Sequence, residues 1–306
     1  MISILAAETV LDPKRIEDGF IQGAIDLHAH GYPEVSLEFK GRVTDPEWAE
    51  AALRLRMGGF VIKSHLWPTM ERAYALQMEF PAVKIFGSLT LNPPVGGLSP
   101  WAVESAVQLG AKVLWFPTWG ARFDIEHHGG KYFRRHLPFY QELTPEKGIT
   151  LVNPSGTLKK EVQEIIGIAQ KADLIVGTGH ISPGETLKLA EYCKSVGFKK
   201  LIFTHPLSLG ASLQEIEQVA GMGFYIELTC LHILLQVVKV SQVIEVIRKI
   251  GDHRCLLATD AFFSWTPPAP EMLRLFAGLL HYHGLDSEAI RQMVYQNPRE
   301  LLGLNE

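Results

Sequence analysis

Hydrophobic residues along the chain form eight short runs that alternate with longer amphipathic stretches. Most runs hold four to seven apolar or β-branched residues, without the strict apolar–polar alternation of a half-exposed strand. Because strands buried on both faces have this pattern, the runs predict a parallel sheet. The expected strands lie within residues 20–28, 59–65, 83–91, 111–119, 172–180, 200–206, 223–230 and 254–262.

The stretches between these runs carry the start and stop signals of helices. Residues 182–197 begin with a serine cap and a proline and end on glycine, and residues 45–59 follow the same order after an aspartate cap. Eight strand–helix repeats predict an α/β fold, a (β/α)8 TIM barrel. A doubly wound open sheet is the alternative, but it usually has a glycine-rich phosphate loop after its first strand, and none follows residues 25–28.

One region interrupts the repeat after the fourth predicted strand. Residues 120–158 form a long excursion, in which residues 149–158, ITLVNPSGTL, predict a small hairpin around an Asn-Pro-Ser-Gly turn. We interpret the excursion as an insertion into a single domain that spans residues 1–306. Since loops at the carboxyl ends of barrel strands build the active face, we expect the insertion to lie near a site.

Composition and charge argue against nucleic-acid binding and membrane insertion, but they do not identify a function. The 306 residues are 47% hydrophobic and 20% charged with a net charge of −4, which is typical of a soluble protein with a large core. No basic tract indicates nucleic-acid binding, and no run approaches the roughly 18 apolar residues of a membrane span. We expect a small-molecule substrate as the partner, with no nucleic acid and no membrane; a homo-oligomeric state is left open.

The cysteines and the N-terminus bear on the cellular compartment. Cys193, Cys230 and Cys255 are isolated and odd in number, which fits a reducing compartment and gives no disulfide framework. The first residues lack the positively charged region of a signal peptide. We therefore expect a cytoplasmic protein.

Polar residues gather at the ends of five of the eight predicted strands. In a barrel these ends meet at one mouth, and strand residues two apart share a face. Imidazole nitrogens and carboxylate oxygens suit Zn²⁺ or a similar divalent ion. The candidates are Asp26, His28, His30, Lys63, His65, His180, His205 and Asp260.

The order of these residues resembles the amidohydrolase superfamily of metal-dependent hydrolases. The likeness rests on DLHAH (26–30), TGH (178–180), FTHP (203–206) and ATD (258–260), and on the ending MVYQNPRELLGL (293–304), which is similar to the last helix of that superfamily. The segments KSHLWPT and FPTWGAR resemble a little-characterised branch of it. The resemblance implies a barrel and one or two divalent metal ions, held by His28, His30, His180, His205 and Asp260.

The sequence departs from the common two-metal pattern at the fourth strand. Many members bridge their ions there with a carboxylated lysine or a glutamate, but the run 111–119 offers only Lys112, at its start. Lys63, paired with His65 on the second strand, is a candidate bridge. The alternative for Lys63 is a cation that binds an anionic substrate group or pairs with a buried acid.

Other residues are expected to support the metal ligands, to bind substrate or to lie in a solvated loop. Asp26 and Glu227 are expected to support the metal ligands from behind, and Trp119 and Arg122 are expected to bind substrate. Solvated loop residues are the simplest interpretation of His127, His128, Arg134 and Arg135, although a lid or an anion site is the alternative.

The ligand set suggests a chemistry in which a metal-activated water attacks an amide, ester, lactone or phosphoester. Asp260 would accept the proton of the water and later deliver it to the leaving group. A decarboxylase or hydratase on the same barrel is the first alternative. A PHP-type phosphoesterase and a catalytically silent binding protein are further alternatives.

Overall fold

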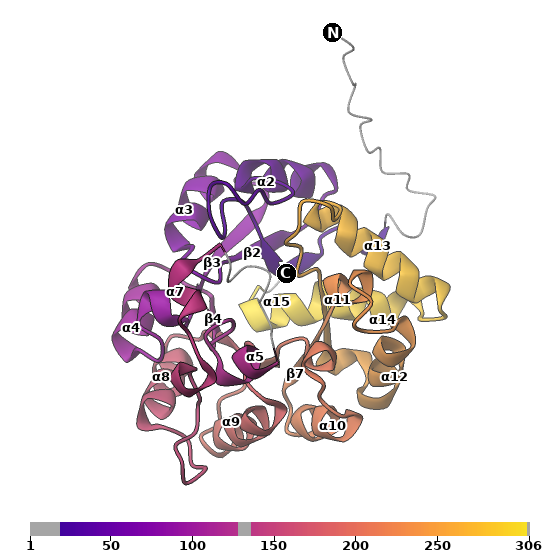
Figure 1. Cartoon of the computed structure of the whole chain (residues 1–306). Coiled ribbons are helices and arrows are strands. Elements are labelled where there is room, and N and C mark those ends of the chain that lie inside the picture. The colour runs from indigo at the N-terminus through magenta and orange to yellow at the C-terminus, as the bar shows by residue number, and fades with distance from the viewer. Residues whose placement is uncertain (1–18, 128–135, 305–306) are drawn as a thin grey trace.

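The computed structural model describes residues 19–127 and 136–304 and contains eight parallel strands in sequential order (Figure 1). Two backbone hydrogen bonds join the last strand to the first, from Asp260 N to His28 O (2.7 Å) and from His30 N to Ala261 O (2.9 Å). The predicted TIM barrel is therefore confirmed. The strands are β1 (Ile25–His30), β2 (Gly59–Lys63), β3 (Lys84–Thr90), β4 (Val113–Trp115), β5 (Ile175–Gly177), β6 (Leu201–Phe203), β7 (Tyr225–Thr229) and β8 (Cys255–Ala258).

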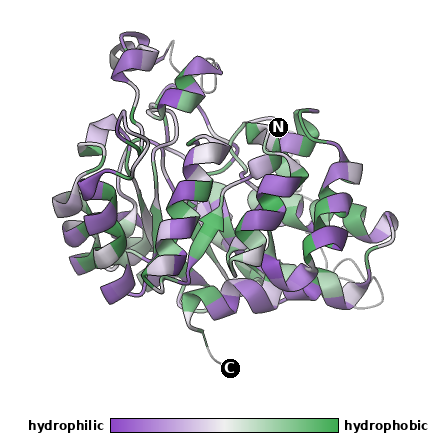
Figure 2. Cartoon of the chain, turned by 90° about the horizontal axis from the view of Figure 1, so that it is seen from below, coloured by the Kyte–Doolittle hydropathy of each residue, from purple (hydrophilic) through white to green (hydrophobic). Residues whose placement is uncertain are grey.

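Helices form a ring around the strands and turn their polar faces outward (Figures 1 and 2). The longer ones are α2 (Asp45–Arg54), α3 (Met70–Glu79), α4 (Pro100–Gln108), α8 (Lys160–Lys171), α9 (Pro183–Ser195), α10 (Leu213–Gly221), α12 (Val240–Ile250) and α13 (Ala269–Tyr282). Shorter turns are η1 (Pro93–Val95), η3 (Pro206–Leu209), α11 (Cys230–Leu234), η4 (Asp252–Arg254), α14 (Ser287–Arg291), the π-helical η5 (Gln292–Gln296) and α15 (Asn297–Leu302). No helix in the described part of the chain is long and apolar enough to cross a membrane.

Side-chain caps fix where these helices begin. Ser182 caps α9 as predicted, and it forms a capping box with Glu185. The predicted cap Asp45 was wrong, because Thr44 occupies that position and Asp45 is the first helical residue. The Thr44 hydroxyl accepts from the Glu47 backbone (3.4 Å), and the Glu47 carboxylate accepts from the Thr44 backbone (2.7 Å).

The apolar core lies partly inside the barrel and partly between strands and helices. Inside, Ile25, Val61 and Ile202 pack with Leu301 and Leu302 of α15, so this helix closes the amino end. The Asn-Pro pair of the sequence starts α15. The Asn297 side chain donates to the carbonyls of Asp252 (2.8 Å) and Cys255 (2.7 Å), which ties α15 to β8. The polar candidate residues lie at the opposite end of the barrel, at the carboxyl ends of the strands.

Between β4 and α8 the chain makes the long excursion indicated by the sequence. It contains the short helices α5 (Arg122–Glu126) and α7 (Pro138–Gln141) and the turn η2 (Pro145–Lys147). The expected hairpin is reduced to one antiparallel bridge between Val152 and Leu158. The side-chain oxygen of Asn153 accepts the backbone N–H groups of Ser155 and Thr157, both at 3.1 Å, so this turn closes on itself.

Candidate metal centre

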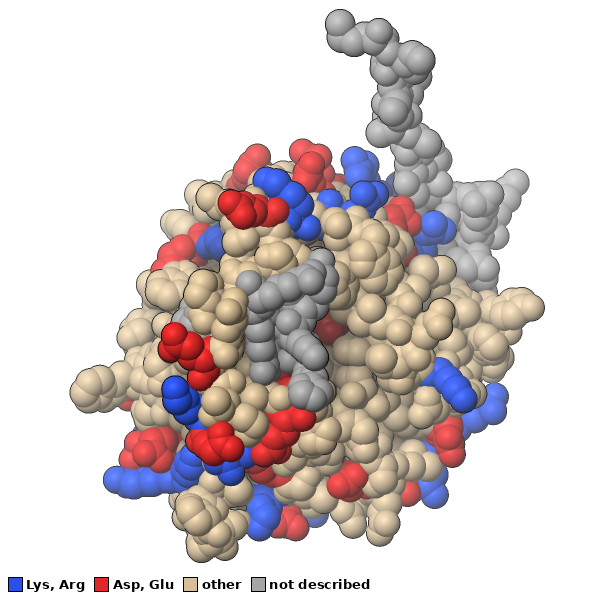
Figure 3. Space-filling model, viewed as in Figure 1, with Lys and Arg blue, Asp and Glu red and all other residues tan. Residues whose placement is uncertain are grey.

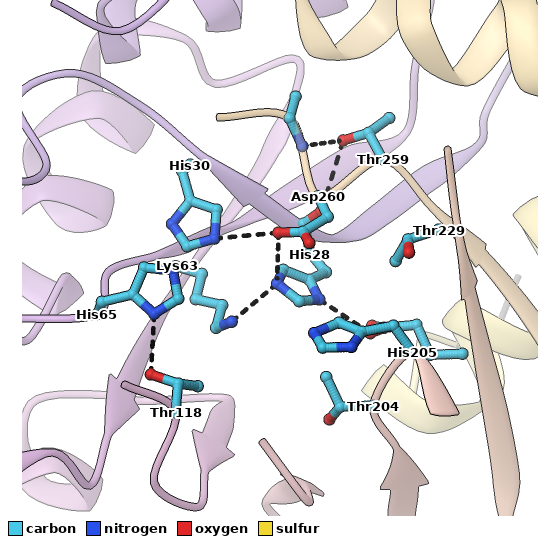
Figure 4. A network of polar contacts seen from close by, with 12 residues as sticks. His28, His30, Lys63, His65, Thr118, Thr204, His205, Thr229, Thr259 and Asp260 are labelled. Atoms are coloured by element: carbon cyan, nitrogen blue, oxygen red, sulfur yellow. Dashed lines mark hydrogen bonds and ion pairs between the residues drawn. The ribbon is translucent and has the colours of Figure 1, made fainter. Parts of the chain in front are cut away.

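The carboxyl ends of β1, β2, β5, β6 and β8 bring the polar candidates to one place at the centre of the barrel. Figure 4 shows those from β1, β2, β6 and β8. Asp26, His28 and His30 lie on β1, and Lys63 is the last residue of β2. His65 follows β2, and His180, His205 and Asp260 follow β5, β6 and β8, each within three residues. Nearly all are buried, although the protein interior normally excludes such groups unless they are paired. The ring centroids of His180 and His205 are 5.0 Å apart, and those of His28 and His205 are 5.8 Å apart.

Asp260 lies between the two histidines of β1. Its Oδ1 is 3.0 Å from Nε2 of His28 and 3.3 Å from Nε2 of His30. Adjacent donor atoms held about 2.1 Å from one ion lie about 3.0–3.4 Å apart, so these three atoms have the spacing of ligands on one metal. Both ring nitrogens of His30 are buried and make no hydrogen bond of good geometry with the described residues, which also fits a cation beside them.

Three of the histidines are held from behind through Nδ1. Nδ1 of His28 lies 2.9 Å from Oε2 of Glu227, and Nδ1 of His180 lies 2.7 Å from Oδ1 of Asp124. A carboxylate only accepts, so both Nδ1 atoms carry a proton, and each ring in its neutral form keeps its lone pair on Nε2. Nδ1 of His205 lies 2.8 Å from Oγ of Ser208, whose own proton goes to the His205 carbonyl (2.9 Å), and the same tautomer follows.

Neighbouring charged groups shift the pKa values of Asp260 and His28 at the centre. Burial raises the pKa of Asp260, but the neighbouring His28 charge and its hydrogen bond outweigh burial and hold the pKa well below the usual range. For His28, burial and Lys63 lower the pKa, whereas Glu227 and Asp260 raise it more strongly, to about 9. Asp260 is therefore a carboxylate at neutral pH.

Lys63 is fully buried with its Nζ 2.8 Å from Nε2 of His28 and 4.8 Å from the ring centroid of Trp115. Burial lowers the pKa of its ammonium, although Asp260 and Glu227 act in the opposite direction. The lysine predicted on the second strand therefore lies against the presumptive ligands rather than on the surface.

Asp26 acts on the backbone and does not contact an imidazole. Its Oδ1 accepts the backbone N–H groups of His28 (3.1 Å) and Thr259 (3.2 Å), and its Oδ2 accepts the Thr259 hydroxyl (2.5 Å). Burial raises the pKa of this carboxyl to about 6 despite those hydrogen bonds. Asp26 thus ties β1 to the end of β8, and the contact with the imidazole of His28 belongs to Glu227.

The backbone is strained where two of the candidates sit. His205 has φ 27° and Asp260 has φ 52°, and both are non-glycine residues in the left-handed region. Such conformations cost about 1–3 kcal/mol and gather at functional sites, where the surrounding structure enforces them. Here the strain turns both side chains from the strand ends toward the centre.

A cavity of about 470 Å³ opens from the centre, and its lining includes His65, His180, His205 and Asp260. Its outer wall is largely apolar; it is made by Trp119, Phe123, Leu231, Leu235, Val237, Phe262 and Phe263. No lysine or arginine lines it among the residues that the structure describes. In Figure 3, most of the visible surface beside the central hollow is tan, acidic atoms are visible inside the hollow, and most other charged groups lie toward the rim.

The two predicted substrate-binding residues have different positions. Trp119 lines the cavity and stacks on His65, with centroids 3.9 Å apart and planes 14° apart. Arg122 is exposed, its Nε donates to the Pro145 carbonyl (3.0 Å), and it does not line the cavity. The predicted loop residues His128, Arg134 and Arg135 lie outside the described residues.

Sequence reasoning missed several residues of the centre. His232 lines the cavity, with its Nδ1 2.7 Å from Thr229 Oγ and 3.9 Å from Asp260 Oδ2. Its position two residues after the seventh predicted strand was a signal that could have found it. Glu34 was also missed, although it follows His30 by only four residues in the sequence. Its Oε1 accepts the His65 backbone N–H (2.6 Å) and lies 3.5 Å from His30 Nδ1. Asp124 and Ser208 had no such signal.

Comparison with known proteins supports the fold and one family. The model of a family of unknown function, DUF6282, matches residues 23–227, about two thirds of the chain. No curated protein sequence matches it significantly.

Several solved structures share the fold. An amidohydrolase from Pseudomonas aeruginosa has a TM-score of 0.62 at 10% identity, with 94% of this chain and 97% of that chain covered. The probable dipeptidase PvdM from the same organism has a TM-score of 0.62 at 11% identity (95% and 98%), and a 2,6-dihydroxybenzoate decarboxylase from Rhizobium has 0.56 at 12% (93% and 100%). The resemblance to the amidohydrolase superfamily is thus confirmed at the level of the fold.

Proposed function

Since the chain belongs to the family of unknown function DUF6282 and has the fold of amidohydrolases, we propose that it is a metal-dependent hydrolase of small molecules. The observation that carries the proposal is the convergence of Nε2 lone pairs and one carboxylate at the carboxyl end of the barrel. His28, His30 and Asp260 form one candidate ligand group. His180 and His205 face the same cavity and complete the proposed set.

The donor set fits a divalent ion, and Zn²⁺ is the choice we propose, because neutral imidazole and carboxylate are its usual ligands. Such an ion, when bound, would lower the pKa of a water and polarise an oxygen of the substrate. Glu227, Asp124 and Ser208 would orient the ligand imidazoles through Nδ1.

Asp260 has two oxygens with different surroundings. Oδ1 lies toward His28 and His30, whereas Oδ2 lies 3.9 Å from Nδ1 of His232. We assign Oδ1 to metal binding and Oδ2 to accepting the proton of the attacking water. The low pKa of Asp260 keeps it ready to accept this proton, and the proton then passes to the leaving group.

The cavity wall favours substrates with an uncharged, apolar body. Phe123, Phe262 and Phe263 offer aromatic surface, and no lysine or arginine among the described residues lines the cavity to pair with a phosphate. We therefore favour an amide, an ester or a lactone over a phosphoester.

A decarboxylase on the same barrel is the second candidate. The aromatic wall fits an aromatic acid, and the fold likeness extends to a 2,6-dihydroxybenzoate decarboxylase. Release of carbon dioxide from such an acid, without net hydrolysis, would favour this reaction.

The test combines metal analysis with a screen of amides, esters, lactones, phosphoesters and aromatic acids. We expect at least one equivalent of divalent metal per chain and turnover of an uncharged substrate. His28→Ala and Asp260→Asn should abolish turnover while the fold persists, and Arg122→Ala, whose side chain lies away from the cavity, should retain it. Protein with less than about half an equivalent of metal and no turnover would point to a silent binding protein.

The free, buried cysteines are consistent with a reducing compartment, and we propose a cytoplasmic location on that ground.

A further inference from the structure

His65 differs from His28 and His180 because a hydroxyl, and not a carboxylate, lies behind its Nδ1. Its ring lines the cavity, between Trp119 on one side and His30 on the other, with centroid distances of 3.9 Å and 4.6 Å. Its Nδ1 is 2.8 Å from the hydroxyl of Thr118, which can donate or accept a proton. The direction of this hydrogen bond decides what Nε2 offers to the cavity.

Asn92 fixes that direction. Its Oδ1 accepts the backbone N–H groups of Thr118 (2.9 Å) and Gly120 (3.0 Å), so its amide cannot be turned around. Its Nδ2 therefore donates, to the His65 carbonyl (2.8 Å) and to Thr118 Oγ (2.6 Å). Thr118 accepts this proton and is itself fully buried, which leaves Nδ1 of His65 as the acceptor for its own hydroxyl proton.

This chain of donors gives His65 the tautomer with its proton on Nε2. His28 and His180 have the opposite tautomer because carboxylates face their Nδ1 atoms. The same fold therefore prepares some imidazoles as acceptors for a cation and His65 as a hydrogen-bond donor.

A second observation also argues against metal binding by His65. His30, Glu34 and His65 have ligand atoms close enough to hold an ion. However, the rings of His30 and His65 are nearly parallel, with planes 14° apart and centroids 4.6 Å apart. The lone pairs of stacked imidazoles lie in separate planes, so they do not converge well on one ion.

We propose that His65 is a catalytic residue that donates a hydrogen bond from Nε2 to the reacting carbonyl oxygen of the substrate, and that it is not a metal ligand. This assignment rests on the proposed hydrolase function. A neutral donor in a cavity wall stabilises the negative charge that develops on such an oxygen. Trp119 holds the ring from one face, and Thr118 holds its proton on the correct nitrogen.

The tautomer can be read directly, without any substrate. Protein labelled with ¹⁵N-histidine and purified with its metal is examined by two-bond ¹H–¹⁵N correlation, and the signal of His65 is identified by its loss in His65→Gln. We expect the proton on Nε2. Thr118→Ser should keep this state and Thr118→Val should lose it, whereas a proton on Nδ1 in the natural protein would overturn the proposal.

Kinetics and metal content test the role. His65→Leu, which removes the donor, should keep the full metal content and lower kcat by about 10²–10³-fold, the usual loss on removing such a donor. His253→Leu, at an exposed position of η4, is the matched control and should change neither. Loss of metal from His65→Leu, or unchanged kcat, would refute the assignment.

The two experiments separate this assignment from the proposed function. If no substrate is hydrolysed, the hydrolase proposal fails. A Nε2 proton would then still establish His65 as a donor to whatever the cavity binds.

Discussion

A carboxylate behind an imidazole does two things for a metal ligand: it fixes the tautomer and it holds the ring in place. Glu227 does this for His28 across nearly two hundred residues of sequence, through the 2.9 Å contact between Oε2 and Nδ1. Its other oxygen, Oε1, is buried without a hydrogen-bond partner among the described residues. The Glu227 side chain is therefore linked to the centre by one hydrogen bond, and removing its carboxylate would leave the His28 imidazole without this support.

We predict that Glu227→Gln weakens metal binding by about 10- to 100-fold, because a neutral amide holds the Nδ1 proton less strongly than a carboxylate. The measurement is a titration of bound metal against a competing chelator. Glu217→Gln is the matched control, since Glu217 pairs with Lys249 at the surface of α10. Equal affinities in the two variants would show that Glu227 does not support the ligand.

Lys63 decides whether the centre holds one ion or two. Burial lowers the pKa of the Lys63 amine, whose Nζ lies beside Nε2 of His28, and this favours the neutral form that can react with carbon dioxide. A bridging carbamate at Lys63 predicts two metal ions per chain and the loss of one in Lys63→Ala, measured by metal analysis. Lys112→Ala, at the exposed start of β4, should leave the count unchanged. A stoichiometry unaffected by Lys63→Ala would leave the lysine as a simple cation.

The loops that follow the strands carry several residues of the candidate site. One of these loops makes a tight turn that requires glycine. Gly179 lies between β5 and His180 with φ +65°, and a side chain there would collide with the carbonyls of Phe116 and Pro117. The backbone N–H of His180 also donates to the Pro117 carbonyl (2.9 Å). The position of His180 thus depends on close packing between two loops.

We predict that Gly179→Ala destabilises the protein by about 1–3 kcal/mol, from the left-handed conformation and the collision, and displaces His180 from the centre. Denaturant unfolding and metal analysis provide the measurements. Gly184→Ala, in the first turn of α9 with open space around it, should be neutral or slightly stabilising. Full metal binding by Gly179→Ala would show that His180 does not depend on this turn.

Elements were predictable here because their signals are local. Eight apolar runs and the caps between them indicated the barrel, and the alternation of His28 and His30 put both on one strand. Contacts between distant segments carry no such signal: Asp124 meets His180 from the excursion, and Asn92 orients Thr118 from another loop. Asp26 was expected to support the ligands, but only the structure shows that it binds backbone amides of β1 and β8.

At the scale of the whole molecule, the proposed ligands come from both ends of the chain. His28 and His30 lie on the first strand, β1, and Asp260 follows the last strand, β8. The barrel closes between these two strands, at a junction that we call the seam, so an ion bound by all three residues would hold the seam together. A ligand that binds only the folded state stabilises it by about 2.7 kcal/mol when its free concentration is about 100 times Kd. Metal content and global stability should therefore change together.

The three cysteines offer a way to observe this linkage. Cys193, Cys230 and Cys255 are free and buried, and burial raises the pKa of the first two thiols to about 12 and that of Cys255 as well. Because a thiol reacts as its thiolate, a raised pKa lowers reactivity at every pH below it. We predict that the native protein does not react with a thiol reagent near pH 8, whereas the protein in denaturant reacts at all three positions.

Removal of the metal with a chelator should then increase the labelling rate, because it raises the population of open states in which these thiols are accessible. Cys255 begins β8 and Cys230 follows β7, so both report on strands next to the seam, whereas Cys193 on α9 lies farther along the ring. Faster labelling of Cys230 and Cys255 with little change at Cys193 would indicate local opening at the seam. Equal acceleration at all three would indicate global unfolding, and no acceleration would contradict a metal that links the first strand to the last.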